Sequence, residues 1–156
     1  MKQNLLKYLL LFFTVATVIS VYAFANAKEE DTINVAEEKG IKFIEQDWDK
    51  ALKQAKAENK LVFIDIYATW CGPCKMLKKN TFSDDAVAEF FNKTFVNVSV
   101  DGEKSVGPEL AKKYSLTAYP TLIVTDAEGK PVLYSVGYMN AEQLMNFAKE
   151  ALKRKS

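Results

Sequence analysis

Hydrophobic positions along the chain form several short apolar runs that are typical of strands. Residues 61–68 are almost continuously apolar and rich in β-branched and aromatic side chains, which predicts a central strand buried on both faces. Residues 95–100 alternate hydrophobic and polar positions and predict a second strand. Residues 41–44 predict an edge strand. Residues 122–125 and 132–136 predict two strands around a hairpin loop that contains Gly129.

Other segments carry the hydrophobic spacing of helices. Asp47 is a plausible N-cap for the first of them, and Ser83 with the two following acids is a start signal for another. The expected helices cover residues 47–58, a segment that opens at Cys71, a segment from 83 toward Phe91, residues 108–114 and residues 141–152. The order β-α-β-α-α-β-α-β-β-α predicts an α/β protein with a central mixed sheet flanked by helices on both faces.

The N-terminal residues differ from the rest of the chain. Residues 1–7 carry two lysines and no acid, residues 8–25 carry no charge, and Ala25-Asn26-Ala27 forms an A-x-A site. These features predict a signal peptide over residues 1–27, and hence an exported, periplasmic protein. The alternative is an uncleaved membrane anchor, because the uncharged stretch approaches the span of a bilayer. Residues 28–39 are acid-rich and are expected to be a tether, followed by one domain over residues 40–156.

Composition narrows the chemistry. The formal net charge is +1, which argues against a nucleic-acid partner. There is no histidine, so Ser–His and Cys–His pairs and histidine metal ligands are excluded. With two cysteines, one chain cannot build a four-cysteine or mixed Cys/His zinc site. We therefore expect no metal and no cofactor, and any cysteine chemistry must use a single pair.

That pair lies in the motif Trp70-Cys71-Gly72-Pro73-Cys74-Lys75, directly after the central strand. Residues three apart in a helix lie about 5 Å from one another, within the range that a disulfide requires. Cys71 is expected at the helix N-terminus, where the macrodipole favours a nucleophilic thiolate, and Cys74 is expected to be the shielded, resolving thiol. Pro73 suits the first helical turn because it has no N–H to lose. A static structural disulfide is the alternative reading, but so short a loop constrains the unfolded chain little.

From about Ile41 to Leu152 the chain resembles the thioredoxin family, and the six-residue motif is among that family's most specific signatures. Asp65 stands where the family keeps a buried acid, Tyr119-Pro120-Thr121 matches its cis-proline loop, and Val136-Gly137 matches a late glycine beside the active site. Residues 79–87 resemble one branch, the C-terminal domain of the DsbD-type membrane thiol:disulfide interchange proteins, and related exported proteins.

The resemblance implies a thioredoxin fold and a reductase of protein disulfides or oxidised cysteines, recharged by a membrane thiol–disulfide electron donor. In related proteins Gly-Pro between the cysteines goes with reductants. Nothing demands more than a monomer. The residues expected to contact substrate are Trp70, Gly72, Pro73, Ala118, Tyr119, Pro120 and Gly137. The alternative for Pro120 is an ordinary turn proline. The alternative for Trp70 and Tyr119 is a place in the hydrophobic core. For Tyr138 and Met139 core and rim positions are equally open.

Asp65 is expected to lie in apolar surroundings, because its same-face neighbours Phe63 and Tyr67 are aromatic. Burial raises the pKa of a carboxyl and leaves it able to exchange a proton near neutral pH, which suits proton transfer with Cys74. A purely structural role is the alternative. The lysine that pairs with this acid in thioredoxins would fall near Asn97, which cannot supply the charge.

Two other functions use the same fold. One is an oxidase or isomerase with the same cysteine pair and the opposite redox poise. The other is a binding or chaperone module without catalysis, against which the complete motif argues.

Overall fold

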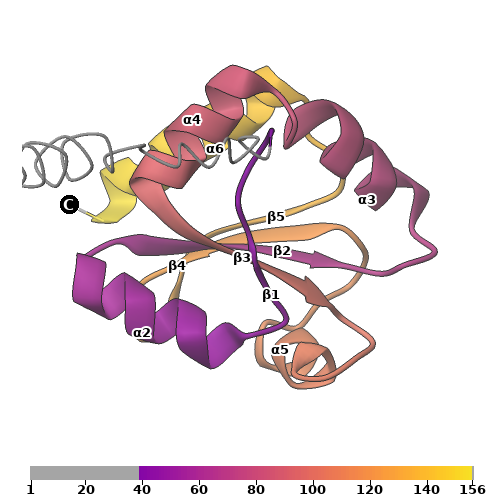
Figure 1. The fold of residues 1–156 in the computed structure, drawn as a ribbon. Coiled ribbons are helices and arrows are strands. Elements are labelled where there is room, and N and C mark those ends of the chain that lie inside the picture. Colours follow the sequence, from indigo (N-terminus) through magenta and orange to yellow (C-terminus); the bar gives the residue numbers. More distant parts are fainter. Residues whose placement is uncertain (1–38, 156) are drawn as a thin grey trace, which may run out of the picture. The chain divides into compact units, whose positions relative to one another are not determined.

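The computed structural model describes residues 39–155, which form a five-stranded sheet with helices on both faces (Figure 1). The predicted signal peptide and nearly all of the predicted tether lie outside the described residues. The strands are β1 (Ile44–Glu45), β2 (Leu61–Tyr67), β3 (Phe95–Asp101), β4 (Thr121–Thr125) and β5 (Pro131–Val136). The helices are α2 (Trp48–Glu58), α3 (Gly72–Met76), the π-helix η1 (Leu77–Thr81), α4 (Asp85–Thr94), α5 (Gly107–Lys113) and α6 (Ala141–Lys155).

The sheet has the order β1-β3-β2-β4-β5. β1, β3 and β2 are parallel, whereas β4 is antiparallel to β2 and β5 is antiparallel to β4. This arrangement confirms the predicted mixed sheet and places β2 at its centre. Because β2 is central and helices cover both faces, the first six of its seven residues are buried and Tyr67 is partly buried, as the continuous apolar run predicted.

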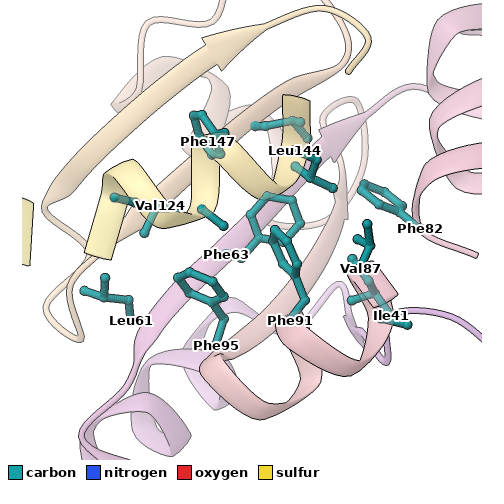
Figure 2. Close-up of a cluster of buried hydrophobic side chains, with 14 of the residues drawn as sticks. Ile41, Leu61, Phe63, Phe82, Val87, Phe91, Phe95, Val124, Leu144 and Phe147 are labelled. Carbon is teal, nitrogen blue, oxygen red and sulfur yellow. The ribbon is translucent and has the colours of Figure 1, made fainter. Parts of the chain in front are cut away.

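Successive side chains of β2 enter opposite halves of the core. Phe63 packs with α4 and α6 on one face, where its ring makes a T-shaped contact with Phe91 at 4.8 Å between centroids. Figure 2 shows Leu144 and Phe147 of α6 over the same cluster. Ile64 packs with α2 and α5 on the other face. The active-site end of β2 is thus held between two packed layers.

The first strand differs from its prediction. An edge strand was expected over residues 41–44, but β1 pairs with β3 only at Ile44 and Glu45. The preceding backbone is used elsewhere: the N–H of Ile41 donates to the carbonyl of Phe82 at 2.8 Å, and the N–H of Lys42 donates to Asn92 Oδ1 at 2.8 Å. Residues 41 and 42 therefore bond to the helical layer, which the hydrophobic pattern did not reveal.

The helix after the cysteines also has an unexpected form. α3 continues into η1, whose wider turn is closed by a hydrogen bond from the N–H of Phe82 to the carbonyl of Leu77 at 2.9 Å. Asp84 then caps α4 through a hydrogen bond from the N–H of Val87 at 3.0 Å. π-Helical turns occur frequently at functional sites. No helix within residues 39–155 is long and apolar enough to cross a membrane.

Asp47 caps α2 as predicted, because its Oδ1 accepts the N–H of Lys50 at 2.9 Å. Replacing Asp47 with alanine is expected to lower the free energy of unfolding by about 1 kcal/mol, since one N–H of the first turn loses its partner. Urea unfolding measures the change. Asp47→Asn keeps an acceptor oxygen and should stay close to the unmodified protein; an equal loss in both variants would contradict the capping role.

Candidate functional site

The two cysteines lie where the chain passes from β2 into α3. A turn closed by the N–H of Cys71 and the carbonyl of Ala68, at 3.1 Å, brings the chain from the strand to the helix. Cys71 is the N-cap of α3, and its Sγ accepts the N–H of Cys74 at 3.2 Å. Pro73 lies in the first turn, as expected. The cap position places the Cys71 sulfur at the N-terminus of the helix within hydrogen-bonding distance of the Cys74 N–H, an environment that favours the thiolate in the reduced form.

Cys71 and Cys74 form a disulfide with 5.4 Å between their Cα atoms, close to the distance expected from helical spacing. Both residues are nearly buried, with exposed fractions of 3% and 7%, and they pack with Ala68, Tyr67 and Tyr119. In this oxidised form Cys71 is no more exposed than Cys74. The expected roles therefore rest on position: Cys71 is the N-cap of α3, and Cys74 lines a cavity together with Asp65.

The loop before β4 lies against the disulfide. The peptide bond between Tyr119 and Pro120 is cis, as the resemblance implied, and Tyr119 packs on the two cysteines. The N–H of Gly137 donates to the carbonyl of Pro120 at 2.8 Å, so the end of β5 supports the loop. Ala118 is exposed and its carbonyl accepts the hydroxyl of Thr121 at 2.7 Å. The structure thus packs Tyr119 against the cysteine cluster, and Ala118 and Gly137 are hydrogen-bonded to the same loop.

Trp70 stands at the rim of the disulfide, with 67% of its surface exposed. Its ring makes a T-shaped contact with Tyr119 at 6.0 Å between centroids. Its Nε1 donates to both carboxylate oxygens of Glu103, each at 3.1 Å. Gly102 makes room for this arrangement, because a Cβ there would lie 2.6 Å from Cε1 of Tyr119. Sequence reasoning missed Gly102 and Glu103, since only the fold places the end of β3 beside the motif.

Tyr138 and Met139, left open by the sequence, take different positions. Tyr138 is exposed, whereas Met139 packs against the core, and its carbonyl accepts the hydroxyl of Thr81 at 2.7 Å. Met76 on α3 is also half exposed, an apolar surface residue near the motif that sequence reasoning did not single out.

Asp65 lies in the middle of β2 and is 7% exposed. Ser99 Oγ, opposite it on β3, donates to Oδ2 at 3.3 Å, and Oδ1 has no hydrogen-bond partner within residues 39–155. Burial is the main cause that raises the pKa of Asp65 to about 7; the Ser99 hydrogen bond and Lys78 lower it, and Glu45 raises it. Asp65 is therefore able to exchange a proton near neutral pH, which agrees with the expectation from its aromatic neighbours.

A cavity of about 250 Å³ links Asp65 to the redox pair, because Asp65 and Cys74 both line it. Other lining side chains are those of Phe43, Glu45, Lys78 and Ser99. A water molecule occupies about 30 Å³ in the liquid, so the cavity has room for a short chain of waters between the carboxyl and the sulfur. Sequence reasoning paired Asp65 with Cys74 but missed Ser99, Glu45 and Lys78, which come from three other elements.

Asn97, near which the resemblance places the lysine of thioredoxins, does not reach Asp65 by hydrogen bonding. Its amide donates to the carbonyls of Phe91 at 3.4 Å and Lys42 at 3.5 Å. It ties β3 to α4 and to the segment before β1. Within the described part of the chain, no group of three or more acidic, cysteine or histidine side chains could hold a metal ion.

A family model described as a thioredoxin-like domain matches residues 48–152. The chain belongs to the thioredoxin-like family. With a Cys-x-x-Cys pair at the end of the central strand, this thioredoxin-like protein is a thiol–disulfide oxidoreductase.

Relatives of this thioredoxin-like chain include thiol:disulfide interchange protein DsbD from Yersinia pestis, 33% identical over 94 residues that make up 58% of this chain and 16% of the relative. DsbD from Pectobacterium atrosepticum is 38% identical over 85 residues, or 53% of this chain and 15% of the relative. The chain therefore spans about a sixth of the length of these curated relatives. The homology supports thiol–disulfide redox partners in general.

Among solved structures, a candidate disulphide-isomerase from Bacteroides thetaiotaomicron matches with a TM-score of 0.67 and 45% identity, over 74% of this chain and 95% of the other. The C-terminal domain of Neisseria meningitidis DsbD in the oxidised form matches with a TM-score of 0.56 over 66% of this chain and 91% of the other. At 24% identity, the second match shows the fold alone.

Proposed function

We propose that this protein reduces disulfides or oxidised cysteines of other proteins outside the cytoplasm. The observation that carries the proposal is the Cys71–Cys74 pair at the start of α3, with the Tyr119–Pro120 loop packed against it and Trp70 exposed at its rim. This arrangement leaves an apolar surface beside the sulfurs. In the proposed complex an extended substrate segment pairs with the backbone at Ala118 and Tyr119, in the manner of an added strand.

In the proposed reaction the Cys71 thiolate attacks a substrate disulfide, forming a mixed disulfide and releasing one substrate thiolate. Cys74 then attacks Cys71, which releases the second substrate thiolate and closes the Cys71–Cys74 disulfide. Asp65 accepts the Cys74 proton across the shared cavity. The substrate gains two electrons and the dithiol loses two, so each turnover requires recharging by a dithiol donor.

Residues 1–27 as a signal peptide and residues 28–39 as a tether belong to the same proposal. In an oxidising compartment a dithiol stays reduced only with an electron supply, so a membrane thiol–disulfide electron donor is the proposed partner. The homology to DsbD supports this choice. N-terminal sequencing of the protein purified from its own cell tests the cleavage: a start at Lys28 is expected, and a start at Met1 would favour an anchor.

The reduction potential of the pair tests the direction of electron flow. The protein is equilibrated against defined thiol buffers and followed by the fluorescence of Trp70, with Trp70→Phe as the control for the signal of buried Trp48. A potential near roughly −270 mV is expected for a reductase, and one toward roughly −120 mV would reverse the proposed direction.

An isomerase is the second candidate, favoured by the 45% identity to the candidate disulphide-isomerase from Bacteroides thetaiotaomicron. Both activities use the same cysteines. Reactivation of a protein with scrambled disulfides separates them: an isomerase restores activity without net loss of disulfides, whereas a reductase lowers the number of disulfides in the substrate.

Asp65→Asn is expected to slow the Cys74 step roughly 100-fold, because the acceptor of the thiol proton is lost. Rapid-quench kinetics of a preformed mixed disulfide between pH 5 and 9 measure the step, and its change of rate around pH 7 should disappear. Ser99→Ala, which removes only the hydroxyl donated to Asp65, is the control and should keep a pH-dependent rate. An unchanged rate and profile in Asp65→Asn would leave Asp65 a structural role.

A further inference from the structure

Two charged side chains that line the cavity beside Cys74, Glu45 and Lys78, have no role in the proposed reaction. Glu45 belongs to β1 and Lys78 to η1. Glu45 is in register with Ser99 of β3, which is in register with Asp65 of β2. Lys78 is four residues after Cys74, so both lie along one side of the helical segment. The exposed side chains of Glu45 and Lys78, which carry opposite charges, thus line the same cavity as the buried carboxyl of Asp65.

Within residues 39–155, Asp65 forms no ion pair with a lysine or arginine. Its Oδ1 is buried without a hydrogen-bond partner in the described residues, and β3 offers it only the Ser99 hydroxyl. β3 contains no lysine or arginine, and the amide of Asn97 donates to the carbonyls of Lys42 and Phe91. A positive charge near Asp65 must therefore come from an element other than β3.

Glu45 and Lys78 are charged groups on the cavity wall with opposite effects on the pKa of Asp65. The other titratable groups on its wall are Lys39, Lys75, Tyr67 and, when reduced, Cys74. After burial and the Ser99 hydrogen bond, Glu45 raises the pKa of Asp65 and Lys78 lowers it. The same two residues are coupled, because burial raises the pKa of Glu45 and Lys78 lowers it.

We propose that Lys78 and Glu45, two charged side chains that line the cavity with Asp65, are positioning residues that control the ionisation of Asp65, with Lys78 supplying the cation that β3 lacks. Lys78 favours the carboxylate that accepts the Cys74 proton, and Glu45 favours the acid that returns the proton through the cavity to solvent. The effect of Lys78 and Glu45 on the ionisation of Asp65 follows from the cavity that they share. Their effect on turnover rests on the proposed reductase function.

The test is a titration of the Asp65 carboxyl carbon by NMR in the oxidised full chain with ¹³C-labelled aspartate. In Lys78→Met the titration midpoint of Asp65 is expected to rise by roughly half a pH unit or more, and in Glu45→Gln to fall by a similar amount. Lys79→Met removes the adjacent exposed charge, which does not line the cavity, and should leave the midpoint unchanged. The Lys78 effect should shrink between about 0.1 M and about 1 M salt, because screening shortens from about 10 Å to about 3 Å.

Opposite displacements in the two variants, absent in Lys79→Met, would support the proposal even if the protein reduced no disulfide. Equal midpoints in Lys78→Met and Lys79→Met would overturn it, whatever the enzyme's activity. The rate of the Cys74 step gives the second readout: its pH profile should move in the same direction as the midpoint in each variant, and Lys78→Arg should restore the profile of the unmodified protein. A Lys78→Arg profile that matched Lys78→Met instead would also overturn the assignment.

Discussion

Replacing Cys71 with serine is expected to reduce disulfide turnover to the uncatalysed background, because a serine hydroxyl does not form the anion that attacks a disulfide at neutral pH. Replacing Cys74 with serine also stops turnover, but at a later step. Its Cys71 still attacks, and without the resolving thiol the mixed disulfide accumulates. Reduction of insulin disulfides measures the first effect, and the mass of the protein after incubation with substrate measures the second.

The two variants are matched controls for each other, because each removes one sulfur of the same disulfide. A covalent adduct in Cys71→Ser and none in Cys74→Ser would reverse the assigned roles. A doubly substituted protein that still restored the phenotype of a deletion strain would show that the cysteines are dispensable and would favour a binding module. Retained far-UV circular dichroism in both variants excludes loss of the fold as the cause.

Asp65→Asn is expected to raise the free energy of unfolding at pH 8 while it slows the enzyme. The pKa of Asp65 is raised from 3.8 to about 7 in the fold, chiefly by burial. At about 1.4 kcal/mol for each pH unit, this difference corresponds to an upper value of roughly 4 kcal/mol. An amide of similar shape avoids the penalty because it is never ionised.

The sign follows from which state holds the proton more tightly. Below pH 3.8 Asp65 is protonated in both states and costs nothing. As the pH rises toward about 7, the unfolded chain releases the proton first, so ionisation favours unfolding and stability falls. Above pH 7 both states are ionised and the full penalty remains.

Urea unfolding of the oxidised protein at pH 5 and pH 8 measures this linkage. The stabilisation by Asp65→Asn is expected to be larger at pH 8 than at pH 5. Asp49→Asn, at an exposed carboxyl of α2, is the matched control and should show no comparable gain. Equal gains at the two pH values, or a loss at pH 8, would refute an ionised Asp65 as the source of the penalty.

The cysteine pair was predictable from sequence because its geometry is local. Three residues of helix fix the distance between Cys71 and Cys74, and the apolar run before them identifies the central strand. The cis bond before Pro120 and a loop facing the cysteines were implied by resemblance; the structure confirms the cis bond and packs Tyr119 of this loop against the cysteine cluster. Local spacing alone would not have placed a loop about fifty residues later against the same sulfurs.

The surroundings of Asp65 were only partly predictable. Alternation along β2 correctly placed it between two aromatic residues and so predicted burial. Ser99 faces it because β3 pairs with β2 in parallel register, and that register is a property of the assembled sheet. Glu103 reaches Trp70 for a similar reason, since the end of β3 adjoins the start of α3.

The sequence by itself determined the fold class, the central strand, the redox pair and the acid behind it, because periodicity and short spacing act within one or two elements. Tertiary structure alone decided what surrounds that acid. The order β1-β3-β2 brings Glu45 to the cavity beside Asp65, and the turn into η1 brings Lys78 to the same cavity. Long-range electrostatics depends on distances between elements, and those distances exist only after the layers have packed.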